Sequence, residues 1–296
     1  MARTIRLAKQ AGFCFGVKRA VDIAMEESAG SKDVVMLGDI VHNEHVVQKI
    51  DKAGVRVEKE LNSVDSGTLL LRAHGTAPEI YREADEKSLN VVDATCPLVL
   101  DIHTVVRQYA NEGYRVVIIG DHGHDEVVGI AGQVEDAIVV SSPEDVKKQI
   151  NSRYKKIGVV LQSTQTIENA QACVAELIPF ARELKYHDTI CGPTKSNQRE
   201  IRKMPNENDV MIIVGSFTSA NTCRMTELSR IRNERTYQVE SADDLQESWF
   251  DGAELVGIHA GASTPDWIIK AVAEAICNYD APEAASSSKT QDRATP

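Results

Sequence analysis

The chain has 296 residues, a net charge of −11 and 42% hydrophobic residues, which is enough apolar material for one large core or for two or three small ones. The acidic balance and the low aromatic content of 5% argue against a protein that binds nucleic acid. No apolar run approaches the roughly 18 residues of a membrane span, and residues 1–13 lack the apolar segment of a secretory signal. We therefore expect a cytoplasmic protein without a membrane partner.

Short apolar runs along the chain predict strands. In chain order these runs are 34–37, 68–71, the weaker 91–92, 116–119, 157–161, 210–214 and 255–258. Segments with helical periodicity lie between them, at 17–28, 79–87, 98–111, 167–184 and 267–279. The alternation of strands and helices predicts an α/β protein whose sheets are largely parallel.

An internal repeat divides the chain into three. Three cysteines are each followed, 24 residues later, by a glycine that ends an apolar run: Cys14 by Gly38, Cys96 by Gly120, and Cys191 by Gly215. Each glycine opens a polar loop, and a second strand in each unit leads into a second polar loop. The repeat predicts three similar α/β units in a pseudo-threefold arrangement: 1–95, 96–190 and 191–280. Residues 281–296 are small and polar, and we expect this tail to be disordered.

The polar loops follow the carboxyl ends of predicted parallel strands, where α/β proteins bind ligands. Three units around one axis would bring Cys14, Cys96 and Cys191 to a single centre. Three thiolates without a fourth protein ligand suit an iron–sulfur cluster with one open iron, since fully ligated clusters use four cysteines. Zinc held by three cysteines and a histidine is the rival, although the chain has no CxxC pair; a buried apolar role is the other alternative.

Three other cysteines lack the 24-residue spacing: Cys173, Cys223 and Cys277. We interpret them as ordinary small side chains. Disulfides are not expected in a chain of this length and compartment.

Histidines recur in the polar loops, at His42, His74 and His124, and hydroxyl and amide side chains accompany them. These groups all donate hydrogen bonds to phosphate oxygens, so the loops favour a phosphate-bearing ligand. A metal bound by His122 and His124 is an alternative, because alternate residues of an extended segment share a face. Glu126 is a candidate proton donor if burial raises its pKa; a solvated loop glutamate is the alternative.

Seven motifs resemble the 4-hydroxy-3-methylbut-2-enyl diphosphate reductase family. They are GFCFGVKRA at 12–20, VHN at 41–43, AHG at 73–75, DATCPLV at 93–99, GHDEVVG at 123–129, QST at 162–164 and AGASTPD at 260–266. The matches span almost the whole ordered chain. The resemblance implies three α/β units around a central iron–sulfur cluster, one [4Fe–4S] cluster with three cysteine ligands, Cys14, Cys96 and Cys191.

The resemblance also implies the reaction. The family carries out the last step of the methylerythritol phosphate route, a reductive dehydroxylation that yields isopentenyl and dimethylallyl diphosphate. Glu126 matches the residue that delivers protons to the departing hydroxyl. The diphosphate contacts are matched by His42, His74, His124, Ser163, Ser219, Ala220, Asn221 and Ser263. The chain has no GxGxxG fingerprint for a flavin or nicotinamide, so we expect an external electron donor, a ferredoxin or flavodoxin.

The sequence departs from the family pattern at several positions. Ala220 replaces a serine, Asp125 replaces a common proline, and Ser163 stands where threonine is usual; the segment GPTKSNQ after Cys191 also differs. These departures leave open a divergent paralogue, either a cluster-dependent hydro-lyase or a non-catalytic iron–sulfur sensor. The cysteines and Glu126 are kept, which favours the reductase.

Overall fold

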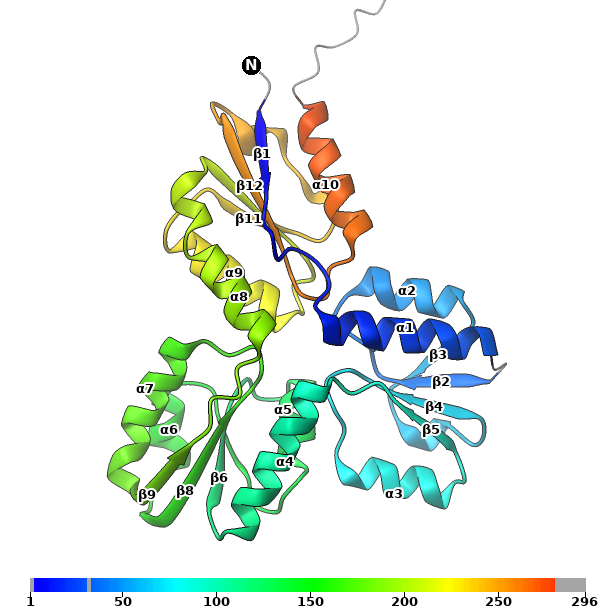
Figure 1. Ribbon diagram of the computed structural model, residues 1–296, viewed down its shortest axis with the longest axis vertical. Coiled ribbons are helices and arrows are strands. Elements are labelled where there is room, and N and C mark those ends of the chain that lie inside the picture. The colour runs from blue at the N-terminus through cyan, green and yellow to red at the C-terminus, as the bar shows by residue number, and fades with distance from the viewer. Residues whose placement is uncertain (1–2, 31–32, 280–296) are drawn as a thin grey trace, which may run out of the picture.

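The computed structural model describes residues 3–30 and 33–279, and the predicted disordered tail at 281–296 lies outside this range. The chain forms three lobes around a common centre, and each lobe holds one four-stranded sheet (Figure 1). Every strand pair in the described chain is parallel. The prediction of an α/β fold with three similar units is confirmed.

The first lobe contains a sheet of order β3-β2-β4-β5. Its strands are β2 (Val34–Leu37), β3 (Arg56–Glu58), β4 (Thr68–Leu71) and β5 (Asn90–Asp93). Helices α1 (Phe15–Gly30) and α2 (Glu44–Lys52) pack against the face of β2 that carries Val34 and Met36. Helix α3 (Pro78–Glu86) packs against the opposite face, which carries Val35 and Leu37. Because side chains on both faces of β2 are buried, the strand is an unbroken apolar run in the sequence and not an alternation of apolar and polar residues.

The second lobe repeats this plan with the sheet β7-β6-β8-β9. Its strands are β6 (Arg115–Ile119), β7 (Ile138–Val140), β8 (Tyr154–Leu161) and β9 (Ala181–Tyr186). Helices α4 (Pro97–Asn111) and α5 (Asp125–Ala131) cover one face, and α6 (Pro143–Gln149) and α7 (Ile167–Leu177) cover the other.

The third lobe has the sheet β11-β10-β12-β1. Its strands are β10 (Val210–Val214), β11 (Thr236–Val239), β12 (Leu255–Ala260) and β1 (Thr4–Leu7). Helices α8 (Gly192–Ile201) and α9 (Ala220–Arg230) carry residues of one core cluster, and α10 (Asp266–Asn278) packs on the other face. Short 3-10 turns complete the described chain at 61–63, 178–180, 204–207, 242–244 and 247–250.

The three sheets share one strand order, but the chain supplies the fourth strand of the third sheet from its beginning. Thr4 to Leu7 pair with Leu255 to Ile258 of β12. Residues 4–7, which fall inside the range 1–95 expected for the first unit, therefore complete the third unit. The chain then passes from β1 in the third lobe to α1 in the first lobe, so the two ends of the described chain both belong to the third lobe (Figure 1).

The predicted helix at 167–184 is wrong in its second half. Helix α7 ends at Leu177, a 3-10 turn covers Ile178–Phe180, and Ala181–Tyr186 form strand β9 against β8. Pro179 accounts for the break, because proline has no N–H to donate and its ring clashes with the preceding helical turn. No helix among residues 3–30 and 33–279 is both long and apolar enough to cross a membrane.

Candidate active site

The three spaced cysteines occupy equivalent places at the joints between lobes. Cys14 precedes the first residue of α1, and Cys96 and Cys191 are the N-cap residues of α4 and α8. The backbone N–H of each cysteine donates to a carbonyl in a loop at the end of a strand of another lobe. These bonds run from Cys14 to Ala262 (3.1 Å), from Cys96 to Ala73 (3.0 Å) and from Cys191 to Ser163 (3.0 Å). The repeat in the sequence therefore corresponds to a repeated backbone anchor.

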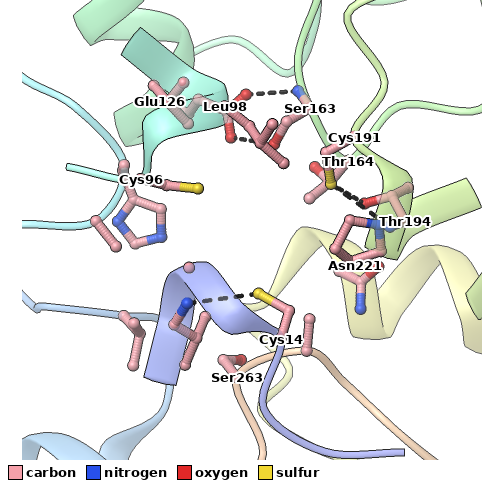
Figure 2. A pocket seen from close by; sticks show the side chains of 18 of the residues that line it. Cys14, Cys96, Leu98, Glu126, Ser163, Thr164, Cys191, Thr194, Asn221 and Ser263 are labelled. Carbon is pink, nitrogen blue, oxygen red and sulfur yellow. Dashed lines mark hydrogen bonds between the residues drawn. The ribbon is translucent and has the colours of Figure 1, made fainter. Parts of the chain in front are cut away.

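The three sulfur atoms face one central space (Figure 2). Cys14, Cys96 and Cys191 line the same pocket. Gly16 makes room for this approach, because a Cβ at position 16 would lie 2.5 Å from Cys96 Sγ and 4.0 Å from Cys14 Sγ. The donor set fits an iron–sulfur cluster, since three free thiols converge without a disulfide between them.

Burial raises the pKa of all three thiols, and a neighbouring cysteine raises each further: Cys191 acts on Cys14, Cys14 on Cys96, and Cys96 on Cys191. The three thiolates are thus costly to hold together without a cation, and a bound metal centre would offset that cost. Backbone N–H groups in the first turns of the helices have the opposite effect, because they lower the pKa of the thiols and favour thiolates. Val17 N–H donates to Cys14 Sγ, and Thr194 N–H donates to Cys191 Sγ.

Three histidines form a compact cluster on one side of the pocket. The ring centroids of His42 and His74 are 4.2 Å apart in a stacked arrangement, and His124 lies 5.0 Å from His42 and 5.8 Å from His74. His124 Nδ1 accepts the backbone N–H of Glu126, which leaves the proton of a neutral ring on Nε2. Each histidine follows a different strand, β2, β4 or β6, so the cluster joins the first and second lobes.

Desolvation lowers the pKa of every histidine in the cluster, to about 4 for His124, and the mutual repulsion of the rings lowers that of His74 further. The rings are therefore neutral in the free pocket at neutral pH. His42 Nε2, His74 Nδ1 and Asn221 Nδ2 are buried without a hydrogen-bond partner among the described residues. Buried polar atoms of this kind normally find a partner, so the pocket is built to receive a ligand with several acceptor oxygens.

Asp125 brings a negative charge to the edge of this cluster. Its Oδ2 lies 2.9 Å from Arg72 Nη1 and 3.9 Å from His42 Nε2. The Asp125 carboxylate acts to raise the pKa of His42, against the larger lowering from burial. Arg72 partly neutralises Asp125, so the substitution of the usual proline adds an ion pair beside the histidines rather than an isolated charge.

Glu126 lies inside the pocket wall and is only 3% exposed. Both carboxylate oxygens accept hydrogen bonds from Ser163: Oε1 from its backbone N–H and Oε2 from its hydroxyl at 2.7 Å. Burial raises the pKa of Glu126, and the bonds from Ser163 act to lower it. A buried carboxyl that is held at both oxygens and has a raised pKa has the properties of a positioned general acid.

The third lobe contributes small polar groups to the opposite wall. Ser219 is the N-cap of α9, Ala220 is the first residue of that helix, and Asn221 follows. Ser263 Oγ donates to the carbonyl of His42 at 3.1 Å, which links the third lobe to the histidine cluster. The absent hydroxyl at Ala220 leaves the first turn of α9 with one fewer side-chain donor toward the pocket.

All the residues that the family resemblance assigns to the site line this one pocket. The alternative metal pair does not form, because His122 Nε2 pairs with Asp145 Oδ2 while His124 joins the histidine cluster. A different trio, His42, His74 and Asp125, has ligand atoms within 4.8 Å of one another. Sequence reasoning missed Thr194, whose hydroxyl accepts from Cys191 Sγ at 3.1 Å; its place three residues after an N-cap cysteine was the available signal.

Comparison with known proteins gives consistent matches over nearly the full length. The family described as LytB protein matches residues 5–277. A protein from Pelobacter propionicus named 4-hydroxy-3-methylbut-2-enyl diphosphate reductase is 43% identical over 267 residues, covering 90% of this chain and 95% of its own. A protein of the same name from Geobacter sulfurreducens is 42% identical, covering 93% and 98%.

Two solved structures share the fold. The structure of the E-1-hydroxy-2-methyl-but-2-enyl-4-diphosphate reductase from Plasmodium falciparum has a TM-score of 0.87 at 29% identity, covering 93% of this chain and 88% of its own. A structure of (E)-4-hydroxy-3-methyl-but-2-enyl diphosphate reductase, described as the terminal enzyme of the non-mevalonate pathway, has a TM-score of 0.69 at 40% identity, covering 94% and 100%. The chain belongs to the LytB protein family, whose relatives here are 4-hydroxy-3-methylbut-2-enyl diphosphate reductases.

Proposed function

We propose that this protein reduces 4-hydroxy-3-methylbut-2-enyl diphosphate to isopentenyl and dimethylallyl diphosphate, the last step of the methylerythritol phosphate pathway. One observation carries the proposal: a single pocket brings together three thiols, a buried carboxyl and three histidines, and ring nitrogens of two of these, His42 and His74, lack hydrogen-bond partners among the described residues. The thiols suit a redox cofactor, the carboxyl suits proton delivery and the histidines suit a diphosphate.

Cys14, Cys96 and Cys191 would hold one [4Fe–4S] cluster. When bound, such a cluster supplies electrons and a Lewis-acidic iron for the substrate oxygen. The protein's part is to hold the cysteines at three helix N-termini and to shape the space beside them.

The histidine cluster would bind the diphosphate end of the substrate. A diphosphate brings negative charge and acceptor oxygens to the nitrogen atoms of His42 and His74 that have no partner in the part of the chain that the structure describes. Asp125 acts to raise the pKa of His42, and the negative charge of a bound diphosphate would act in the same direction. Asn221 and Ser263 would complete the contacts from the third lobe, while the same lobe stays attached to His42 through the Ser263 bond.

Glu126 would deliver the proton that lets the substrate hydroxyl leave. The reaction breaks the allylic C–O bond, releases water, and consumes two electrons and two protons. One proton goes to the departing hydroxyl, and the other goes to carbon. The raised pKa of Glu126 keeps the carboxyl closer to its protonated form, and Ser163 holds both of its oxygens in place.

The two electrons come from outside this chain, and we propose a ferredoxin or flavodoxin as their source. We also propose a cytoplasmic location, which agrees with the free state of all six cysteines. The names of the relatives do not favour a hydro-lyase or a non-catalytic sensor.

The test is an anaerobic assay with the substrate and a chemically reduced viologen dye as electron donor. The proposal expects dye oxidation that requires both the cluster-loaded protein and the substrate. A hydro-lyase would convert the substrate without the dye, and a sensor would leave the substrate unchanged, so either result would refute the proposal.

A further inference from the structure

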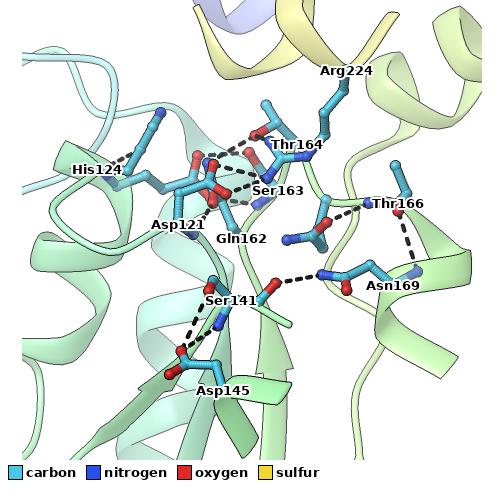
Figure 3. Close-up of polar contacts among 12 residues, drawn as sticks. Asp121, His124, Ser141, Asp145, Gln162, Ser163, Thr164, Thr166, Asn169 and Arg224 are labelled. Carbon is cyan, nitrogen blue, oxygen red and sulfur yellow. Dashed lines mark hydrogen bonds and ion pairs between the residues drawn. The ribbon is translucent and has the colours of Figure 1, made fainter. Parts of the chain in front are cut away.

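Arg224 lies behind the acid side of the pocket and crosses from the third lobe to the second. It stands on α9, three residues after Asn221. Its guanidinium reaches both carboxylate oxygens of Asp121, at 2.7 and 2.8 Å, and donates to Thr164 Oγ1 at 3.3 Å (Figure 3). The arginine side chain is 12% exposed and that of Asp121 is 43% exposed, so the ion pair is shielded from solvent mainly on the arginine side.

Gln162 closes these contacts into a ring. Its Nε2 donates to Thr164 Oγ1 at 3.0 Å, and its Oε1 accepts the backbone N–H of Asp121 at 2.9 Å. Thr164 thus receives donors from two side chains, one from each lobe. The ring of hydrogen bonds among Asp121, Gln162, Thr164 and Arg224 joins the loop after β6, the loop after β8 and helix α9.

The residue in the middle of the tied loop is Ser163. It lies between Gln162 and Thr164, and it is the residue that holds both oxygens of Glu126. At the other end of the ring, the first turn of α9 carries Ser219 and Asn221 into the pocket. The ring therefore fixes the distance between the acid and the polar wall of the third lobe.

We propose that Arg224 is a positioning residue that couples the two halves of the site, holding the Ser163 loop and its acid against the first turn of α9. The inference rests on the proposed function for its effect on turnover. Beyond that function, it states that the affinity for diphosphate and the position of Glu126 both depend on the Arg224–Asp121 ion pair, which lies outside the reacting groups.

The chain offers a matched control. Arg202, at the end of α8, also makes a two-oxygen ion pair with a carboxylate of the second lobe, Glu168 on α7, at 2.8 and 2.8 Å. Neither residue lines the central pocket. The substitution Arg202→Met therefore removes a comparable bond between lobes without touching the ring.

The experiment compares Arg224→Met, Arg224→Lys, Asp121→Asn and Arg202→Met in anaerobically prepared, cluster-loaded protein. The measurements are kcat and KM, the affinity for inorganic diphosphate by calorimetry, and hydrogen exchange of the Ser163 amide. Because Arg224→Met removes hydrogen bonds to a charged group, we expect it to lower kcat about tenfold and the affinity for diphosphate about tenfold. Arg224→Lys should recover part of both, and the Ser163 amide should exchange faster in Arg224→Met.

The sign of the Asp121→Asn effect separates positioning from a simple charge effect. Positioning predicts that Asp121→Asn, like Arg224→Met, lowers kcat and diphosphate affinity. It also predicts that a variant carrying both Asp121→Asn and Arg224→Met loses no more kcat or affinity than the more impaired of the two single variants. A through-space effect predicts the opposite sign, because removal of a negative charge favours an anion. Opposite signs would overturn the proposal, and so would Arg224→Met behaving like Arg202→Met. The exchange and diphosphate measurements need no turnover, so an inactive wild-type protein would count against the proposed function alone.

Discussion

The Ser163 hydroxyl donates to Glu126 Oε2 at 2.7 Å, and the backbone N–H of the same residue donates to Oε1. One residue of the loop after β8 therefore fixes both oxygens of a carboxyl on α5. The carboxyl is buried, and burial raises its pKa while the two bonds act to lower it. This balance leaves an acid that is oriented and still able to lose its proton.

The first prediction concerns this acid. Glu126→Gln keeps the shape and one of the two acceptor oxygens, but it replaces the other oxygen with an NH2 group and removes the transferable proton. Turnover should fall by the roughly 10²–10⁴-fold typical of losing a positioned general acid. Cluster content and diphosphate affinity should stay within a few-fold of the wild type. Steady-state kinetics, iron analysis and calorimetry on one preparation would check this.

A carboxyl with no part in the reaction would give a different result. Glu168, which lies on α7 outside the pocket lining and has 59% of its side chain exposed, is a suitable control. If Glu126→Gln turned over substrate as fast as Glu168→Gln does, proton delivery by Glu126 would be ruled out.

The second prediction concerns the cluster ligands. Cys14→Ser, Cys96→Ser and Cys191→Ser should each lose the brown colour and most of the iron, because each removes one of the thiolates that face the centre. Cys223→Ser and Cys277→Ser should keep the full iron content, since these cysteines lie outside the pocket lining. Iron and sulfide analysis of anaerobic preparations decides the matter, and a full complement of iron in any of the first three variants would contradict the assignment.

The third prediction concerns the diphosphate. His42→Ala and His74→Ala each remove a ring nitrogen that lacks a hydrogen-bond partner within residues 3–30 and 33–279. A charge-assisted contact to phosphate is worth roughly 1.5–3 kcal/mol, so the affinity for diphosphate should fall about ten- to a hundredfold. His122→Ala is the control, because His122 pairs with Asp145 instead of joining the cluster. Equal affinity in all three variants and the wild type would exclude this binding site.

The fourth prediction concerns protons. Burial lowers the pKa of His42 in the free protein, and a bound diphosphate would raise it. A group whose pKa rises on binding takes up a proton, so diphosphate affinity should increase as the pH falls from about 8 towards the ordinary histidine pKa of about 6.5. Calorimetry at pH 7 in buffers of different protonation enthalpy should show net proton uptake. His42→Gln should take up fewer protons; the same uptake in both proteins would show that His42 does not titrate on binding.

The central strands of the fold could be predicted from the sequence because they are buried on both faces. Val34–Leu37, Thr68–Leu71 and Val210–Val214 are strands at the predicted bounds, and all of their residues are buried. The outer strands β3 and β7 were missed, since three residues on the edge of a sheet carry too little apolar pattern. Strand β1 could not have been placed in the third sheet, because its partner lies some 250 residues away along the chain.

In the site, too, some features could be predicted from the sequence and others could not. The cysteine spacing pointed to Cys14, Cys96 and Cys191 because a repeated unit repeats its ligand position. The ion pairs Arg72–Asp125 and Asp121–Arg224 join residues that are far apart in sequence, and no spacing marks them. Charged residues are common in loops and most are solvated, so only the fold shows which of them meet beside a pocket.

A count of electrons against product in the wild-type protein tests the proposed reductive dehydroxylation. Cluster-loaded protein, 4-hydroxy-3-methylbut-2-enyl diphosphate and a titrated viologen donor are combined without oxygen, and the organic products are quantified. We expect isopentenyl and dimethylallyl diphosphate, with two electrons consumed for each molecule formed. Product formed without electron consumption, or electrons consumed without loss of the substrate hydroxyl, would contradict the proposed reaction.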